Sequence, residues 1–264
     1  MADALGIGWS HQLEAKVAVM TVWCIGSYIA YHSIAYARAR NRSSVAGGKK
    51  TTAGAEEGVV TTDDRDVAGR IVSLMHCVPV TVTSLVTVMT SSPLDFTAAN
   101  GLEPTLGSFG LCLSVAYFTY DLRVVIETRF HPFVPMVAHH LLSGSCMCLI
   151  ALAVPRAVWY ACLLQATEAT APLNIGIFFL ERRVRHKAMA LYCAARWLQL
   201  LLWLVMREAL FVYFARTVWS NWASMPPVMK ALGWGTGVPL AAFNTAGLFK
   251  VVLKGFPWLP QKQA

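Results

Sequence analysis

Two adjacent histidines, His139 and His140, stand inside an apolar stretch of this 264-residue chain. Neighbouring residues on a helix point about 100° apart, so one imidazole can face a cavity while the other braces it. Asp121 follows an aromatic run in the preceding apolar stretch and can pair with a cavity histidine or with Arg123 or Arg129. A histidine beside a carboxylate suits acyl transfer, because the imidazole takes a proton or carries the acyl group while the acid orients it.

Other polar side chains interrupt the apolar stretches. We predict that five of them line or support a cavity: His76, Gln165, Glu168, Asn174 and Arg196. At about 1.5 Å per helical residue, most of this set falls in the half of the membrane that we predict to be cytosolic. Polar groups at similar depths on several helices must face one another, because hydrocarbon cannot satisfy them.

Two of the charged residues also have structural interpretations. Glu168 can be kept neutral by burial or can pair with Arg196. We interpret Arg207 and Glu208, near the opposite end of the same apolar stretch as Arg196, as a structural pair.

Other site chemistries fit these residues less well. Two adjacent histidines on one helix do not easily bind one metal ion, and a di-iron oxygenase needs more histidines at helical spacing than the seven present. A serine triad lacks its Gly-x-Ser-x-Gly turn. The seven cysteines form no Cys-x-x-Cys pair and lie in apolar stretches, which predicts reduced packing residues. We therefore expect no cofactor, with acyl-CoA as a candidate co-substrate.

The composition indicates where these residues lie. Hydrophobic residues make up 56% of the chain and charged residues 14%, whereas a soluble domain carries about 25% charged residues. A bilayer core takes about 20 apolar helical residues, and seven stretches qualify, at about residues 15–36, 68–90, 105–126, 135–154, 156–180, 188–214 and 231–253. We predict an all-α polytopic membrane bundle of about seven spans, the last six of which surround a cavity.

Basic residues set the predicted orientation and the division of the chain. With the amino end outside, sixteen of the 22 Lys and Arg residues fall in cytosolic segments and four outside, a bias that marks the cytosolic side. Residues 1–37 are expected to hold an uncleaved first span, because no cationic segment precedes it. We predict a disordered cytosolic linker at residues 38–66, a six-span domain at 67–255 and a cytosolic tail at 256–264.

Four short blocks of sequence resemble a known family. They are Arg70-Ile-Val-Ser-Leu-Met-His76, Tyr117-Phe-Thr-Tyr-Asp121-Leu, Met136-Val-Ala-His-His-Leu-Leu-Ser143 and Glu168-Ala-Thr-Ala-Pro-Leu-Asn174. These blocks, in this order, resemble the conserved blocks of TLC-domain membrane proteins, the family that includes the ceramide synthases. The resemblance covers about residues 65–255.

The resemblance implies an endoplasmic-reticulum membrane protein that acts on lipids. In ceramide synthases, a double histidine and nearby acidic residues carry the N-acylation of a sphingoid base by acyl-CoA. By position, His139 and His140 would be the catalytic pair, with Asp121 in support. The synthases also have a His-Asp pair in the fifth-span region, where this chain has Gln165-Ala-Thr-Glu168. The chain is more similar to shorter TLC-domain-containing proteins, whose general role is lipid homeostasis.

Three functions follow as hypotheses. The first is lipid homeostasis in the endoplasmic reticulum, with acyl-CoA-dependent N-acyltransferase activity. The second is a non-catalytic lipid-binding or membrane-composition regulator, and the third is a seven-span receptor or small transporter. Expected partners are a membrane lipid or sphingoid base, acyl-CoA attracted by the basic loops around Arg129 and Arg182–Lys187, and a second copy of the chain. Nucleic acid is not expected, because no soluble face interleaves basic and aromatic residues.

Overall fold

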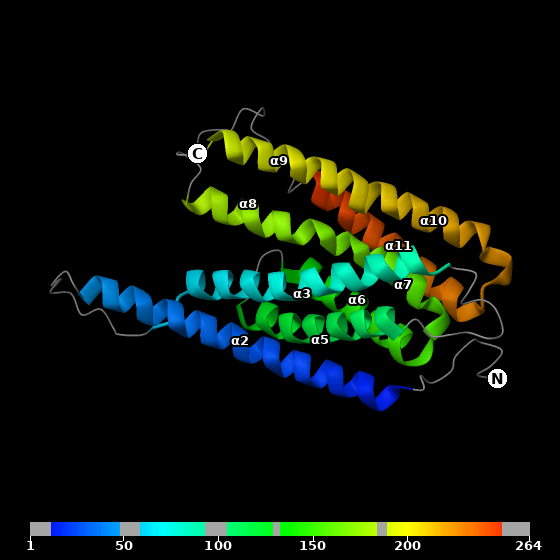
Figure 1. Ribbon diagram of the computed structural model, residues 1–264, viewed down its shortest axis with the longest axis horizontal. Coiled ribbons are helices and arrows are strands. Elements are labelled where there is room, and N and C mark those ends of the chain that lie inside the picture. The colour runs from blue at the N-terminus through cyan, green and yellow to red at the C-terminus, as the bar shows by residue number, and fades with distance from the viewer. Residues whose placement is uncertain (1–11, 48–58, 93–104, 129–132, 184–188, 250–264) are drawn as a thin grey trace.

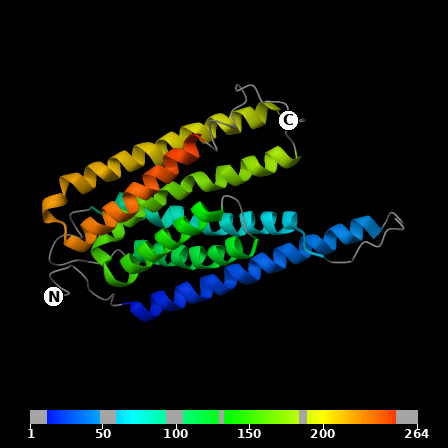
Figure 2. The same ribbon diagram turned by 180° about the vertical axis from the view of Figure 1, so that it is seen from behind.

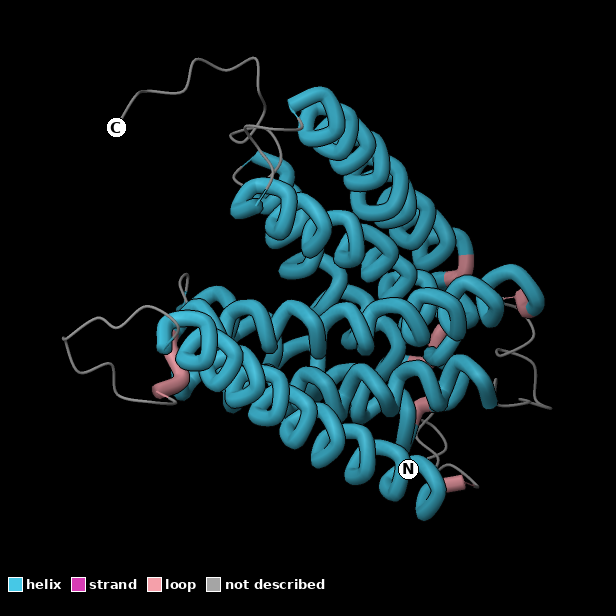
Figure 3. The backbone as a smooth tube through the Cα atoms, turned by 60° about the vertical axis from the view of Figure 1, so that its left-hand side comes forward, coloured by secondary structure: helices cyan, strands magenta, loops and turns pink. Residues whose placement is uncertain are grey.

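The computed structural model describes residues 12–47, 59–92, 105–128, 133–183 and 189–249. Within these ranges the chain forms helices joined by short turns and contains no strand (Figure 3). The all-α prediction is confirmed.

Four long helices make up the first half of the bundle. They are α2 (Leu13–Gly47), α3 (Thr62–Thr90), α5 (Thr105–Thr128) and α6 (Phe133–Ala153). Helix α5 is the central one and packs against α2, α3 and α6. Figures 1 and 2 show α2 along one flank of the bundle. Lys16 of α2 is buried and its Nζ donates a hydrogen bond of 2.8 Å to the carbonyl of Ala151, which ties α2 to the last turn of α6.

The fifth predicted stretch is an interrupted helix. It consists of the short turn η1 (Pro155–Ala157), α7 (Val158–Gln165), the 3₁₀ segment η2 (Ala166–Thr170) and α8 (Ala171–Arg183). Pro172 explains the interruption, because proline lacks an N–H and its ring clashes with the carbonyl four residues earlier, here that of Glu168. The N–H of Ala171 binds the Glu168 carbonyl instead, with the tighter 3₁₀ spacing.

The remaining helices form the opposite flank. They are α9 (Met189–Trp203), the π-helical segment η3 (Leu204–Ala209), α10 (Leu210–Ser220), the short turn η4 (Trp222–Ser224) and α11 (Pro227–Gly247). Helices α9 and α10 run on through η3 as one rod, on the side of the bundle away from α2 (Figures 1 and 2). Helix α11 packs against α6, η3 and α10, and so closes the space between the two halves.

Within the described residues, five helices are long and apolar enough to cross a membrane. They are Leu13–Ser44, Thr62–Thr90, Leu106–Thr128, Phe133–Ala153 and Met189–Ser220. The interrupted α7–η2–α8 segment and α11 coincide with the other two predicted stretches but are not among these five. The count of seven spans therefore stays a prediction.

The predicted disordered linker is wrong at both of its ends. Residues 38–47 continue α2, and residues 62–66 form the first turn of α3. Thr61 and Asp64 form a capping box at the start of α3, and Arg42 lies 2.9 Å and Arg38 3.6 Å from the Asp64 carboxylate. These ion pairs join the end of α2 to the start of α3. The polar composition of the segment indicated disorder and gave no sign of these pairs. Residues 48–58 and the predicted tail at 256–264 lie outside the described residues.

Candidate functional site

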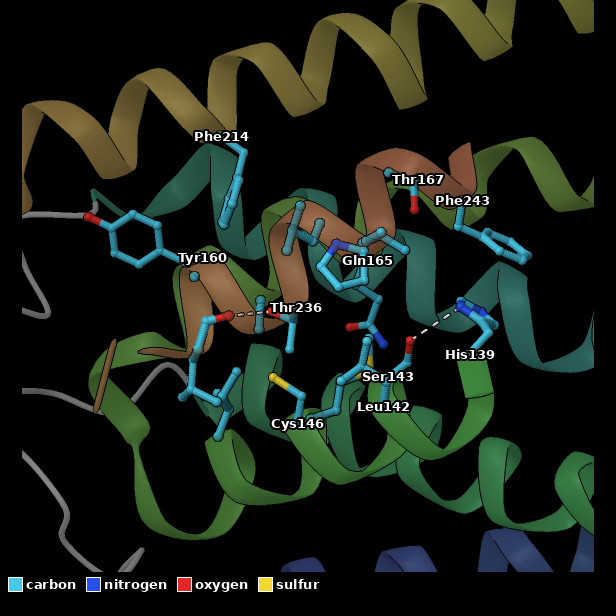
Figure 4. A pocket seen from close by; sticks show the side chains of 18 of the residues that line it. His139, Leu142, Ser143, Cys146, Tyr160, Gln165, Thr167, Phe214, Thr236 and Phe243 are labelled. Atoms are coloured by element: carbon cyan, nitrogen blue, oxygen red, sulfur yellow. Dashed lines mark hydrogen bonds between the residues drawn. The ribbon is translucent and has the colours of Figure 1, made fainter. Parts of the chain in front are cut away.

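An apolar cavity of about 440 Å³ lies between α6, α7, η2, α10 and α11. One face of α6 forms a wall, from Pro135 through His139 and Cys146 to Ile150. At 1.5 Å per residue, this wall is about 22 Å long. Tyr160 of α7 and Phe214 of α10 line the cavity from other sides (Figure 4). An elongated space with mostly apolar walls suits a hydrocarbon chain.

His139 presents its ring to this cavity. The ring stacks on Phe243 of α11, with centroids 4.6 Å apart and planes 5° from parallel. Nδ1 of His139 lies 3.4 Å from Oγ of Ser143, one helical turn further along α6 (Figure 4). Among the described residues no carboxylate contacts this imidazole. His139 thus stands in the cavity wall with a fixed ring plane and a hydroxyl as its neighbour.

His140 points away from the cavity and is held at both ring nitrogens. Its Nδ1 lies 2.7 Å from the carbonyl oxygen of Met136, and its Nε2 lies 2.7 Å from Oδ2 of Asp121. A carbonyl oxygen can only accept, so Nδ1 must carry a proton. A second proton is therefore shared between Nε2 and Asp121, and the pair is neutral overall. In this state His140 has no ring nitrogen left for a substrate.

Phe118 of α5 lies beside both imidazoles. Its ring meets that of His139 edge to face at 5.6 Å and that of His140 at 5.4 Å. The structure thus brings His139, His140 and Asp121 together, as predicted, and gives the two histidines different surroundings. Sequence reasoning missed Phe243 and Ser143, although Ser143 follows His139 at the i+4 spacing that places both on one helical face.

His76 and Gln165 belong to a buried network between α3, α5 and α7. Oε1 of Gln165 accepts a hydrogen bond of 2.9 Å from Ser84, and its Nε2 donates to Oγ of Ser114. Nε2 of His76 lies 3.5 Å from the same Ser114 oxygen, and the His76 ring stacks on Tyr117 at 4.1 Å. Gln165 also reaches the cavity wall, whereas His76 does not line the cavity. His76 therefore packs three helices together instead of facing a ligand.

Glu168 lines the cavity from η2. The groups whose charge acts on its carboxyl group are Arg207 and, more weakly, His140. The alternative of a pair with Arg196 is therefore not what the structure shows. Arg196 and Asn174 lie outside the cavity lining. Arg196 is buried on α9, and Oδ1 of Asn174 on α8 accepts a hydrogen bond of 2.7 Å from Gln199 of α9.

Arg207 occupies a junction of three helical segments. Its Nε donates to Oγ1 of Thr170 and its Nη1 to Oδ1 of Asn244, both at 2.9 Å. The guanidinium also lies 4.4 Å from the ring centroid of Trp203. No ion pair with Glu208 is found among the described residues, although the charge of Glu208 acts on Arg207. The sequence indicates this junction only through an arginine in the middle of an apolar stretch. The partners of Arg207 were not predictable, because they lie far from it in the sequence.

The basic segments expected to attract acyl-CoA are described only in part. Arg182 binds the carboxylates of Asp63 and Asp66, the latter at 3.0 Å. Arg123 pairs with Glu127 at 2.7 Å and not with Asp121. Arg129 and residues 184–188 lie outside the described residues.

Metal-binding geometry is not found in the part of the chain that the structure describes, where no three His, Cys, Asp or Glu residues are placed to hold an ion. All seven cysteines lie in described helices as free thiols.

Comparison with known proteins adds one match. The family model of the TLC domain matches residues 66–253, a range that contains the cavity, the histidine doublet and Asp121. No curated protein and no solved structure matches the chain. The matched region makes up most of the sequence and agrees with the four blocks noted above. The chain therefore belongs to the TLC-domain family of integral membrane proteins, a family associated with lipids.

Proposed function

We propose that this protein serves lipid homeostasis in the endoplasmic reticulum as an acyl-CoA-dependent N-acyltransferase. The amine lipid, a sphingoid base or a similar compound, and the acyl group would meet at His139. The observation that carries the proposal is the position of His139, in the wall of an apolar cavity that is lined by about 22 Å of α6. A hydrocarbon chain in this cavity would have its reactive end beside an imidazole.

The two histidines have different roles in this proposal. His139 is the catalytic residue, because its ring faces the cavity. His140 is a positioning residue, because both of its nitrogens are engaged by Met136 and Asp121. The His140–Asp121 pair fixes the rotation of α6 against α5, and thereby the direction in which His139 points. The sequence led us to expect that both histidines act directly in catalysis. In this proposal only His139 does so.

The reaction joins the lipid amine to the acyl carbon. The amine nitrogen attacks the thioester carbon, an N–C bond forms and the C–S bond breaks. His139 takes a proton from the attacking nitrogen and gives it to the departing thiolate of CoA. The amide and the free thiol are the products, and Phe243 keeps the imidazole plane fixed throughout.

Reconstitution of the full chain in lipid nanodiscs tests this activity. The probes are palmitoyl-CoA and sphinganine, and the readout is the amide product measured by mass spectrometry. We expect His139→Ala to abolish the product and His140→Ala and Asp121→Asn to reduce it. His32→Ala, an exposed histidine on α2, serves as the matched control and should leave the rate unchanged. Full activity in a folded His139→Ala protein would refute the enzymatic role.

A non-catalytic lipid-binding role is the second candidate. It is favoured by the surroundings of His139 in the described structure. The ring nitrogen of His139 has the Ser143 hydroxyl as its neighbour, whereas a catalytic imidazole commonly has a carboxylate there. In that case palmitate and sphinganine would bind the nanodisc-embedded chain without turnover. The cavity variant Leu164→Trp would weaken this binding, whereas His139→Ala would not.

Orientation and location belong to the same proposal. We place the amino end in the lumen and the carboxyl end in the cytosol on the bias of basic residues. The sequon Asn41-Arg42-Ser43 would then face the cytosol and stay unmodified. Glycosylation of Asn41 in cells, read as a mass shift removed by a glycosidase, would reverse the orientation.

A further inference from the structure

Helix α9 buries polar side chains and exposes apolar ones. Its buried residues are Tyr192, Arg196, Gln199 and Trp203, and each carries a polar group. Its outward residues are apolar, for example Leu201, which is 58% exposed. In a membrane the apolar face meets lipid, so the polar face must be satisfied inside the protein.

The polar face of α9 meets polar partners on α8 and α11. Gln199 donates to Asn174 of α8 at 2.7 Å, and Nε1 of Trp203 donates to the carbonyl of Asn244 of α11 at 3.3 Å. We name this feature the polar seam and define it by six residues: Asn174, Tyr192, Arg196, Gln199, Arg207 and Asn244. Residues 192, 196, 199, 203 and 207 follow one another at helical spacing along a single face of the α9–η3 rod.

The two ends of the polar seam lie in different environments. At one end, the hydroxyl of Tyr192 donates a hydrogen bond of 2.7 Å to the carboxylate of Glu181, which is exposed near the end of α8. At the other end, Arg207 binds Thr170 of η2, the segment from which Glu168 lines the cavity, and the charge of Arg207 acts on Glu168. The seam thus leads from the surface near the α8–α9 connection to the cavity.

Two buried polar atoms of the seam lack a hydrogen-bond partner among the described residues. They are Oε1 of Gln199 and Nδ2 of Asn244, on side chains that are 3% and 1% exposed. A buried polar atom without a partner costs about 1–3 kcal/mol. Buried water usually satisfies such atoms where several polar groups converge.

We propose that the polar seam is a hydrated pathway through which protons pass between the membrane surface at Glu181 and the carboxyl group of Glu168. Water bridging the amides of Asn174, Gln199 and Asn244 would connect the two carboxylates. The titratable groups whose charge reaches Glu168 are Arg207 of η3, His140 of α6, Tyr117 of α5 and Cys77 of α3. None of the other three lies in the seam, so Arg207 alone links Glu168 to it.

Such a pathway would serve the proposed N-acylation, on which this step rests. An ammonium group of the lipid has three protons, and the amide nitrogen of the product keeps one. His139 passes one proton to the thiolate of CoA, and one remains to leave the apolar cavity. Glu168 would accept that proton from the ammonium group before attack and release it through the seam.

Thiol labelling tests the hydration without any assay of activity. Gln199→Cys places a thiol in the seam, and Leu201→Cys places one on the lipid face at nearly the same depth. In nanodiscs a small charged methanethiosulfonate should modify Gln199→Cys at least about tenfold faster, because only a thiolate reacts and a thiolate needs water. The wild-type chain gives the background from its own cysteines, and Asn174→Cys repeats the test from α8. Equal rates for all three variants would overturn the pathway.

A second measurement tests the proton role. Gln199→Leu should slow amide formation several-fold at saturating substrate and shift its pH profile, while the KM for sphinganine is unchanged. Leu201→Ala, its neighbour on the lipid face, should match the wild type. Unchanged turnover in Gln199→Leu would refute the proton role even in a hydrated seam. A wild-type chain with no acyltransferase activity would refute the proposed function instead, and the labelling result would still decide the seam.

Discussion

Helices α7 and α9 are both apolar in sequence, but they use their apolar residues in opposite ways. Seven of the eight residues of α7 are buried in the protein, from Val158 to Gln165. In α9 each of the four buried residues carries a polar group, and leucines such as Leu198 and Leu201 face outward. In a membrane, therefore, the polar residues of a helix show which side faces the protein, and the apolar residues do not.

The two helices are consequently held by different forces. Lipid is as apolar as leucine, so burial of apolar surface gives little driving force between membrane helices. Helix α7 is held by close packing, and its side chains join a core with α5, α6 and α10. The α9–η3 rod is held by hydrogen bonds to α8, η2 and α11. Substitutions that remove either kind of contact should show this difference.

The largest effect is expected at Arg207. Arg207→Leu would remove the hydrogen bonds to Thr170 and Asn244 and the positive charge that acts on Glu168 in the membrane interior. Each hydrogen bond to a charged group contributes about 1.5–3 kcal/mol. Thermal unfolding of the purified protein in nanodiscs should show a correspondingly large drop in Tm. Arg216→Leu, on the exposed face of α10, is the control and should change the Tm little.

Truncation of a leucine should have opposite outcomes on the two helices. Leu163 of α7 is 1% exposed, and Leu163→Ala should destabilise by about 2–5 kcal/mol through the cavity that it leaves. Leu201→Ala removes the same atoms from the lipid face of α9 and should cost less than about 0.5 kcal/mol. If denaturant titrations showed equal losses of unfolding free energy for the two variants, this would contradict the assignment of the leucines of α9 to its lipid face.

Much of the site was predictable because intramembrane polar residues are few. The doublet His139–His140 and Asp121 were chosen by residue type and depth, and the structure places them in contact. Their different surroundings were not predictable, because a helix rotation of about 100° decides which imidazole faces the cavity. Their chemical roles stay predictions.

Contacts between distant segments account for the rest of the differences. Asn244 and Thr170 bind Arg207 across 37 positions of sequence in each direction, a distance over which spacing gives no information. The helical structure of residues 38–47 likewise depends on ion pairs with Asp63 and Asp64 of α3. The interruption of the fifth stretch had a local signal in Pro172, which predicts a break but not its 3₁₀ geometry.

The close packing of α7 also depends on a glycine of α5. A Cβ atom at Gly107 would lie 2.9 Å from Sγ of Cys162 on α7 and 2.9 Å from Cγ2 of Thr87 on α3. Gly107→Ala should therefore force the three helices apart and cost about 1–3 kcal/mol, as overpacking does. Gly176→Ala, where a Cβ meets nothing within 4 Å, is the matched control. A Tm for Gly107→Ala as high as that of the control would show that close packing does not hold α7.

The smallest effect is expected for the amide pair of the seam. Gln199→Leu removes the hydrogen bond to Asn174, and such bonds between membrane helices contribute about 0.6 kcal/mol on average and at most about 1.7. Replacing both partners removes the stranded polar group as well, so Asn174→Leu with Gln199→Leu should be less destabilising than the sum of the single changes. A double-mutant cycle by chemical denaturation in nanodiscs measures this coupling. A strictly additive cycle would refute the coupling between the two amides that their direct hydrogen bond predicts.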